Sequence, residues 1–284
     1  FNFRSSTTIK TMKILITGGS GFIGRSLIKA LKEEYDVFAP SSKELDITNS
    51  YDVKKYLQNK YFDWVIHCAI DGGKRTIEDK EDVAYNNIKM FFNLMNSKDR
   101  FGKLINFASG AEFDRTSAIN SNTNDLKNSY PTDPYGMSKN VISRIIQSCR
   151  NCYNFRVYGV FGEDEDDTRF IKSNIKKYKN TEDLEIHQQK AFDFFYIEDL
   201  ITIVKYYINN PKYYLDTDMD FVYQQKHKLI DIGNIINNLS AYKVKVEASD
   251  YREAPSYIGS NLGITLDIEL IGLEEGIKRV YNAL

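Results

Sequence analysis

The sequence predicts an α/β protein: a doubly wound parallel sheet joined by a smaller mixed lobe toward the C-terminus. Two observations predict the sheet. Short, almost continuously apolar segments alternate with segments of helical periodicity up to about residue 160, as in parallel sheets that helices cover on both faces. A glycine-rich turn also separates the first strand from the first helix. Right-handed crossovers between the strands then give the doubly wound arrangement.

The first half of the chain supplies the sheet. Strands are predicted at 13–17, 37–39, 64–68, 103–107 and 153–157, and helices at 22–34, after Ser50, at 81–95 and at 134–150. In the first helix Ile23, Leu27 and Leu31 share one face. Pro134 lies just inside the start of its helix, where the missing N–H has no partner to lose.

The second half has a looser pattern. Helices are expected near 168–179, 197–210, 229–239 and 272–283, with short strands near 221–223 and 244–246. These elements predict a mixed lobe that packs on the C-terminal edge of the sheet. Residues 1–11 are polar and patternless, and we expect them to be a disordered leader or a cloning remnant, with Met12 as the natural start.

Composition excludes several classes of protein. A net charge of −1 gives no basic surface for nucleic acid or an anionic membrane. No apolar run is long enough to span a bilayer, and no signal peptide is recognisable. Cys149 and Cys152 form a lone Cys-x-x-Cys pair without the second pair that a zinc site needs, so no metal site is predicted. Reduced thiols, Cys68 included, suit a cytoplasmic protein.

The glycine-rich turn predicts a dinucleotide site. Residues 17–24 read TGGSGFIG, which places Gly18, Gly21 and Gly24 between a strand and a helix. The first glycine permits the tight turn, the second lets a pyrophosphate approach, and the third lets the helix pack closely. The helix start then offers free N–H groups to the phosphates. Residues 12–160 are therefore the expected dinucleotide-binding core, and 161–284 mostly a substrate-binding lobe with some segments returning to the core.

The end of the second strand indicates which dinucleotide is bound. A carboxylate there would bind the adenosine ribose and repel a 2′-phosphate. That position falls on Ser41, followed by Ser42 and Lys43, so no acid is present and hydroxyls with a cation favour a 2′-phosphate. We predict that NADP(H) is preferred, with NAD(H) as the alternative.

Three residues are candidate catalytic groups. Tyr135 and Lys139 stand four positions apart in a predicted helix, so they share one face. A nearby ammonium group is expected to lower the pKa of the phenol from its usual value of about 10. Ser109 follows the strand 103–107, and parallel strands deliver catalytic groups at their carboxyl ends. Its hydroxyl can hydrogen-bond a substrate carbonyl.

Together these segments resemble the extended short-chain dehydrogenase/reductase family, also called the NAD-dependent epimerase/dehydratase family. The resemblance runs from Met12 to the C-terminus. It is carried by the following segments: 17–24 (TGGSGFIG), 45–48 (LDIT), 65–69 (VIHCA), 87–88 (NI), Ser109, 134–139 (PYGMSK), 155–156 (FR) with 160–162 (VFG), 193–199 (DFFYIED) and 273–277 (LEEGI).

The resemblance implies a Rossmann fold and a role for each matching position. Tyr135 would exchange the proton on a sugar oxygen, Lys139 would hold the nicotinamide ribose and tune Tyr135, and Ser109 would orient the C4 oxygen. Asp46 and Ile47 would flank the adenine. The full set of implied cofactor-binding residues is Gly18, Gly21, Phe22, Ile23, Gly24, Ser41, Ser42, Asp46, Ile47, Cys68, Ala69, Asn87, Tyr135 and Lys139.

Departures from the family pattern narrow the activity. Sugar 4,6-dehydratases carry an Asp-Glu pair directly after the serine, whereas Gly110 and Ala111 follow Ser109 here. The enzymes that make GDP-fucose carry a cysteine at the position of Ala111. Many 4-epimerases have an asparagine at the position of Gly159, and the usual arginine before Asp-Phe is Phe192. Gly110, Ala111, Arg169 and Arg252 are the candidate substrate-binding residues, although either arginine could equally be a surface residue.

The stretch 43–48 and the short chain favour the reductase branch, such as dTDP-4-dehydrorhamnose reductase. The leading prediction is a 4-ketoreductase of a nucleotide-linked sugar, with hydride from NADPH and a proton from Tyr135. A 4-epimerase with tightly bound NAD is the alternative. A non-catalytic NADP-binding regulator is a third, which the presence of Ser109, Tyr135 and Lys139 disfavours. The resembled family often forms dimers, so a homodimer is also expected.

Overall fold

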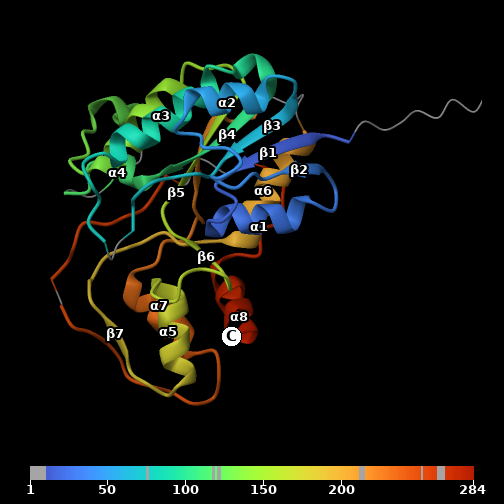
Figure 1. The fold of residues 1–284 in the computed structure, drawn as a ribbon. Coiled ribbons are helices and arrows are strands. Elements are labelled where there is room, and N and C mark those ends of the chain that lie inside the picture. Colours follow the sequence, from blue (N-terminus) through green and yellow to red (C-terminus); the bar gives the residue numbers. More distant parts are fainter. Residues whose placement is uncertain are drawn as a thin grey trace, which may run out of the picture.

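A six-stranded parallel sheet forms the centre of the computed structural model, which describes residues 11–74, 77–116, 119, 123–210, 215–250, 252–260 and 266–284 (Figure 1). The strand order is β2-β1-β3-β4-β5-β9. The strands are β1 (Lys13–Thr17), β2 (Asp36–Phe38), β3 (Phe62–His67), β4 (Phe101–Ser109), β5 (Cys152–Val157) and β9 (Asp218–Phe221). The leader expected at 1–11 lies outside the described residues, apart from Thr11.

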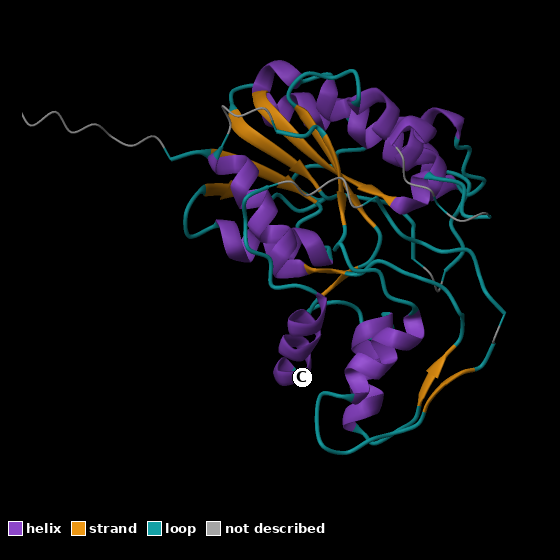
Figure 2. Cartoon of the chain, turned by 180° about the vertical axis from the view of Figure 1, so that it is seen from behind, coloured by secondary structure: helices purple, strands orange, loops and turns teal. Residues whose placement is uncertain are grey.

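Helices cover both faces of this sheet, as the apolar strands predict (Figures 1 and 2). One face carries α2 (Ser50–Leu57), α3 (Val83–Met95) and α4 (Pro134–Ile146), and the other carries α1 (Phe22–Leu31) and α6 (Ile197–Asn209). Side chains of β1 alternate between the two cores: Leu15 packs with the first group, whereas Ile14 and Ile16 pack with the second. The predicted fold class, a doubly wound α/β sheet, is confirmed.

The remaining elements form a smaller lobe beside the sheet, drawn yellow to red in Figure 1. It contains α5 (Phe170–Lys179), α7 (Leu229–Asn237), α8 (Leu273–Ala283) and the parallel pair β7 (Leu184–Ile186) and β10 (Val246–Ala248). A second parallel pair joins β6 (Val160–Phe161) to β8 (Phe195–Tyr196). One continuous apolar core runs from Ile16 of the sheet through Phe155 to Ile175, Ile232 and Ile277 of the lobe. The lobe is therefore fixed to the sheet by shared packing.

Several elements differ from the sequence prediction. The helix expected at 22–34 ends at Leu31, because the N–H groups of Glu34 and Tyr35 turn back to its carbonyl. The strand expected at 221–223 is β9, which lies in the central sheet beside β5 and not in the lobe. The strands β6, β7 and β8 were not predicted, since segments of two or three residues carry no readable periodicity. No helix in the described ranges is long and apolar enough to cross a membrane.

A buried ion cluster joins β5 and β9 to the turn that follows Ser109. That turn is the 3₁₀ segment η2 (Gly110–Glu112). Two further 3₁₀ segments lie elsewhere in the described residues, η1 (Lys98–Arg100) and η3 (Thr123–Asn128). The Arg156 guanidinium is fully buried and donates to the carboxylates of Glu112, Asp218 and Asp220, the last two at 2.7 and 2.5 Å. One cation shared by three carboxylates leaves negative charge in excess.

Helix α4 closes over the same cluster. The Ser143 hydroxyl donates to Glu112 Oε2 at 2.5 Å, and the Asn140 amide donates to the Glu112 carbonyl oxygen at 2.9 Å. The cluster therefore fixes the helix that carries Tyr135 and Lys139 relative to the turn that carries Ser109. Burial, with Asp218 adding to it, raises the pKa of Glu112 to about 7 even though Arg156 opposes the rise.

The cluster predicts that stability depends on pH through Glu112. Its pKa in the folded protein exceeds the ordinary value of 4.5, so its contribution to stability is complete below that value and is lost as pH rises through about 7. Glu112→Gln replaces the carboxyl group by an amide that does not titrate. The free energy of unfolding of the variant, relative to wild type, should therefore rise by about 2–3 kcal/mol from pH 5 to pH 8. Urea unfolding at several pH values measures the difference.

The control for this prediction is Glu274→Gln, which neutralises an exposed glutamate in the first turn of α8. Its stability relative to wild type should not change over the same range. A constant difference between Glu112→Gln and wild type at all pH values would contradict the raised pKa.

Candidate active site

The glycine loop after β1 has a backbone that side chains would not permit. Gly18 has a φ of 72°, and a Cβ there would lie 2.4 Å from the backbone nitrogen of Ala69. A Cβ on Gly24 would lie 2.3 Å from the Gly18 carbonyl oxygen, so only glycine lets α1 pack this close. Gly21 precedes α1 and no side chain caps the helix, which leaves its first turn available to an anion.

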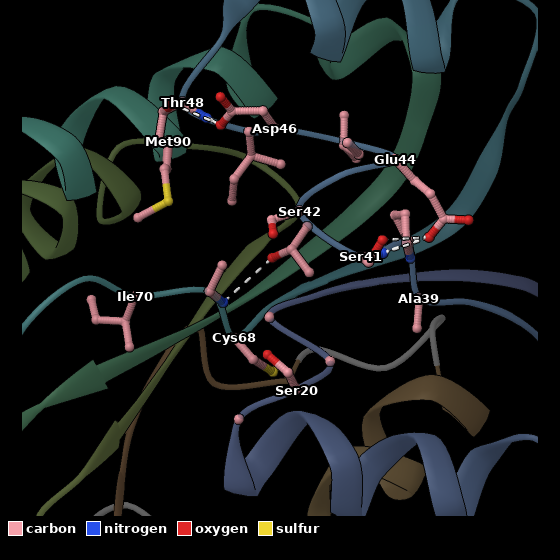
Figure 3. A pocket seen from close by; sticks show the side chains of 18 of the residues that line it. Ser20, Ala39, Ser41, Ser42, Glu44, Asp46, Thr48, Cys68, Ile70 and Met90 are labelled. Carbon is pink, nitrogen blue, oxygen red and sulfur yellow. Dashed lines mark hydrogen bonds between the residues drawn. The ribbon is translucent and has the colours of Figure 1, made fainter.

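A cavity of about 790 Å³ opens at this loop, between the segments that follow β2 and β3 (Figure 3). Its size lies within the range of about 300–1,000 Å³ that small-molecule and cofactor sites occupy. The predicted cofactor residues that line it are Gly18, Gly21, Ser41, Ser42, Asp46, Ile47, Cys68 and Ala69. Phe22, Ile23, Gly24, Asn87, Tyr135 and Lys139 are not in its lining.

Sequence reasoning missed one acidic group in the cavity. The Glu44 carboxylate reaches back to Ser41, whose N–H and hydroxyl both donate to Glu44 Oε2 at 2.8 Å (Figure 3). These hydrogen bonds hold the pKa of Glu44 below its ordinary value, so the group is charged at neutral pH. The Ser-x-x-Glu spacing of a capping box was the available signal. An acid is therefore present at the position where the sequence indicated only hydroxyls and a cation.

The other predicted cofactor residues are held by neighbouring elements. Asp46 accepts hydrogen bonds from the N–H and hydroxyl of Thr48 at 2.9 and 2.7 Å, and the Ile47 carbonyl accepts one from Asn93 of α3 at 2.9 Å. Burial raises the pKa of the Cys68 thiol to about 12, so this group stays protonated beside the cavity. His67 is also buried and its pKa falls to about 3, which leaves it neutral.

Asn87 of α3 connects the segment after β3 with α4, the helix that carries Tyr135 and Lys139. Its side chain exchanges two hydrogen bonds with the backbone of Asp71, at 2.8 and 3.0 Å, and donates to the Ser138 hydroxyl at 3.1 Å. Ser138 in turn donates to the Tyr135 carbonyl oxygen at 2.7 Å. Asn87 therefore supports the position of Tyr135 from outside the cavity.

The three candidate catalytic residues converge beside the end of β4. The hydroxyl of Ser109 accepts a hydrogen bond from the Ala111 N–H at 3.2 Å and hydrogen-bonds the Tyr135 phenol. Lys139 lies one helical turn after Tyr135, with its Nζ 5.7 Å from the centre of the Tyr135 ring. The backbone of Gly73, which has a φ of 73°, lies against that ring. A Cβ at Gly73 would lie only 2.6 Å from Tyr135 Cε2.

The charges at this site differ from the sequence expectation. Burial raises the pKa of Tyr135 above its ordinary value, and the Ser109 hydrogen bond with the positive charges of Arg115 and Arg169 only partly opposes the rise. The Lys139 ammonium group donates to the Phe107 carbonyl oxygen at 2.6 Å. Burial lowers the pKa of Lys139 itself to about 8. Tyr135 is thus protonated at neutral pH.

The four candidate substrate residues lie in different surroundings. Gly110 and Ala111 form the buried turn after Ser109. Arg169 precedes α5, lies 3.8 Å from the buried Glu165, and its charge acts on Tyr135. The side chain of Arg252 is 90% exposed and pairs with Asp250, so it fits the surface alternative. No cluster of three or more metal-binding side chains occurs within the described ranges.

Gly159 and Phe192, two residues that depart from the family pattern, lie against each other. Phe192 is buried, and a Cβ on Gly159 would lie 2.8 Å from its ring. The Phe192 ring stacks on Phe194 and also contacts Tyr257, with centroids 4.6 and 5.0 Å apart. The missing side chain at position 159 therefore makes the space that an aromatic ring fills at position 192.

The chain is similar to enzymes of nucleotide-sugar metabolism. GDP-L-colitose synthase of Yersinia pseudotuberculosis is 26% identical over 226 residues, which cover 70% of this chain and 73% of that protein. A GDP-mannoheptose C4 reductase of Campylobacter jejuni with NADP bound has the same fold, with a TM-score of 0.76 and 17% identity over 96% of this chain and 98% of that one.

A dTDP-4-dehydrorhamnose reductase of Clostridium acetobutylicum is a third similar protein. Its structure matches with a TM-score of 0.77 and 22% identity over 95% of this chain and 99% of that one. The family model described as "NAD dependent epimerase/dehydratase family" matches residues 14–217. The chain therefore belongs to the NAD-dependent epimerase/dehydratase family, the extended type of short-chain dehydrogenase/reductase.

Proposed function

We propose that the protein reduces the C4 ketone of a nucleotide-linked sugar, with hydride from NADPH and a proton from Tyr135. One observation carries this proposal: the Ser109 hydroxyl hydrogen-bonds the Tyr135 phenol at the end of β4, while Gly110 and Ala111 follow Ser109. The site holds groups for one proton transfer to one oxygen. The carboxylates that a dehydratase places after the serine are replaced by residues without acid or base.

The raised pKa of Tyr135 supports reduction. As hydride reaches C4, the carbonyl electrons move to oxygen, and a protonated phenol can donate its proton to the resulting alkoxide. An epimerase must begin by removing a proton from a hydroxyl, which requires a phenolate. Because burial keeps Tyr135 protonated, the site suits the direction that starts from a ketone.

NADPH supplies a hydride when it is bound, and the chain contributes its position. We place the pyrophosphate on the loop of Gly18, Gly21 and Gly24 at the start of α1, with Phe22 and Ile23 as its first helical residues. Ser41 and Ser42 would take the 2′-phosphate, Asp46 and Ile47 the adenine, and Lys139 the nicotinamide ribose. Cys68, Ala69 and Asn87 would line or support the remainder.

The substrate lies, in this proposal, between the sheet and the lobe formed by most of residues 161–284. Arg169 is the proposed contact for a phosphate oxygen of the substrate, since its charge acts on Tyr135 and a guanidinium matches phosphate geometry. The relatives act on GDP- and dTDP-linked compounds, as their names state, which supports a nucleotide-linked sugar as the substrate class.

The proposal predicts loss of NADPH with a 4-keto nucleotide sugar. Purified protein is incubated with a panel of nucleotide-linked 4-keto sugars, and NADPH is followed by its near-UV absorbance. One substrate should be consumed in a one-to-one ratio with NADPH. Tyr135→Phe should lower kcat by about 10²–10⁴-fold, because the proton donor is removed.

One result would contradict this prediction and support the 4-epimerase alternative. Interconversion of ordinary nucleotide sugars without net NADPH loss, by protein that co-purifies with NAD, would establish a 4-epimerase. Unchanged turnover in Tyr135→Phe would remove the proposed mechanism.

A second prediction concerns the cofactor. The Glu44 carboxylate occupies the Ser41 donors that a 2′-phosphate needs, so it competes with NADPH for them. Glu44→Gln should strengthen NADPH binding relative to NADH binding by about threefold to tenfold, since it removes a screened surface charge. Fluorescence titration of each reduced cofactor gives the two dissociation constants. Glu33→Gln, an equal charge change in the turn after α1, is the control. An unchanged ratio of the two constants would contradict the competition.

We also propose a cytoplasmic homodimer. The three cysteines are free thiols, which suits a reducing compartment. Tyr85 and Phe92 of α3 and Met137 of α4 are 64%, 41% and 46% exposed, and these two helices pack side by side. Light scattering coupled to gel filtration should give about twice the chain mass of 32.9 kDa. Tyr85→Asp with Phe92→Asp should yield monomers, and a wild-type monomer would contradict the proposal.

A further inference from the structure

Tyr257 brings a second phenol to the catalytic serine. Its hydroxyl oxygen lies 3.4 Å from Ser109 Oγ, longer than the about 2.5–3.0 Å usual for a bond between hydroxyls, although 148 positions separate the two residues in the chain. No motif marks Tyr257, and it comes from the segment after β10, which is distant along the chain from the strands of the sheet that supply Ser109 and its neighbours.

Backbone contacts fix the position of Tyr257. Its N–H donates to the Ala191 carbonyl at 2.9 Å, and its carbonyl accepts from the Asp193 N–H at 3.1 Å. Its ring lies against Phe192, with centroids 5.0 Å apart, and meets the edge of Tyr158 at 5.2 Å. The ring is therefore held from two sides, and its hydroxyl end is held beside Ser109.

The turn after Ser109 is shaped to this ring. A Cβ on Gly110 would lie 2.4 Å from Tyr158 Cδ1 and 3.0 Å from Tyr257 Cζ, so a side chain there would displace both rings. The aromatic residue Phe192, at the position where the family usually has an arginine, supports the other side of the ring. These two features of the sequence thus serve the same contact.

The donors and acceptors around Ser109 give the contact with Tyr257 a direction. A serine hydroxyl has one proton and two lone pairs. The Ala111 N–H uses one lone pair of Ser109, and the phenols of Tyr135 and Tyr257 compete for the other lone pair and the proton. If Tyr257 donates to the second lone pair, the Ser109 proton is left to point toward Tyr135, the side on which the substrate oxygen is placed.

We propose that Tyr257 is a positioning residue that acts through Ser109: its hydroxyl donates to Ser109 Oγ and turns the serine O–H toward the C4 oxygen of the sugar. The identity of that oxygen rests on the proposed function. The contact between Tyr257 and Ser109 is independent of it, because Ser109 would hold the same oxygen in a reductase and in an epimerase.

Tyr158 is the matched control. It belongs to the same aromatic cluster and also packs on Gly110, but its hydroxyl donates to Asp220 Oδ2 at 3.4 Å and its side chain is buried. Tyr257→Phe and Tyr158→Phe therefore remove one oxygen each from neighbouring rings, and only the first oxygen faces Ser109.

The kinetic test compares these two variants in whichever activity the wild type shows. Tyr257→Phe should lower kcat about tenfold, as expected for one lost hydrogen bond, with KM for the sugar and the cofactor changed less than about twofold. Tyr158→Phe should keep the wild-type kcat. In a Ser109→Ala background Tyr257→Phe should have no further effect. Equal kcat in the two single variants, or a full tenfold effect without Ser109, would overturn the proposal.

A second test needs no substrate and so separates this proposal from the proposed function. Ser109→Cys places a thiol at the same position, and its pKa is read from the rate of iodoacetamide alkylation against pH, by mass spectrometry of the peptide. A phenol that donates to this position stabilises the thiolate, so adding Tyr257→Phe should raise the thiol pKa by about 0.5 to 1. Adding Tyr158→Phe should leave it unchanged. No rise with Tyr257→Phe would overturn the proposal even if reductase activity is found, and a rise would sustain it even if none is found.

Discussion

The buried guanidinium of Arg156 holds together the elements that carry the candidate catalytic groups. It lies in β5 and binds carboxylates of β9 and of the turn after Ser109, while Ser143 and Asn140 attach α4 to the same turn. Removing a charge from water is costly, and the cost is recovered only when the partners are in place. The cluster therefore favours a single relative placement of strand, turn and helix, which sets the distance between Ser109 and Tyr135.

Burial, more than any single charge, sets the chemistry of the site. It raises the pKa of Tyr135, lowers that of Lys139 to about 8 and leaves His67 neutral. A phenol that keeps its proton and a lysine that donates to a backbone carbonyl fit the proposed donation of one proton. The sequence expectation of a lowered tyrosine pKa considered the cation alone and omitted the loss of solvent around it.

The glycine loop and the region around Ser109 differ in how closely their residues follow the family pattern. The glycine loop follows the pattern closely, because steric contacts at Gly18 and Gly24 allow no other residue. The proposed substrate side departs from it, with Phe192 and Gly159 packed together and Tyr257 next to Ser109. Solved structures at 17% and 22% identity share the fold with TM-scores of 0.76 and 0.77, whereas their names record different nucleotides and sugars.

The sequence by itself determined the doubly wound sheet, the glycine loop and the spacing of Tyr135 and Lys139, because each depends on neighbours along the chain: apolar runs, turn sterics and one helical turn. Only the tertiary structure decided what depends on distant contacts. It moved the expected lobe strand into the sheet as β9, and folded Glu44 back onto Ser41. It also buried Arg156 among three carboxylates and placed Tyr257 beside Ser109 across 148 positions. Periodicity records which face of an element is apolar, but not which distant polar group that element will meet.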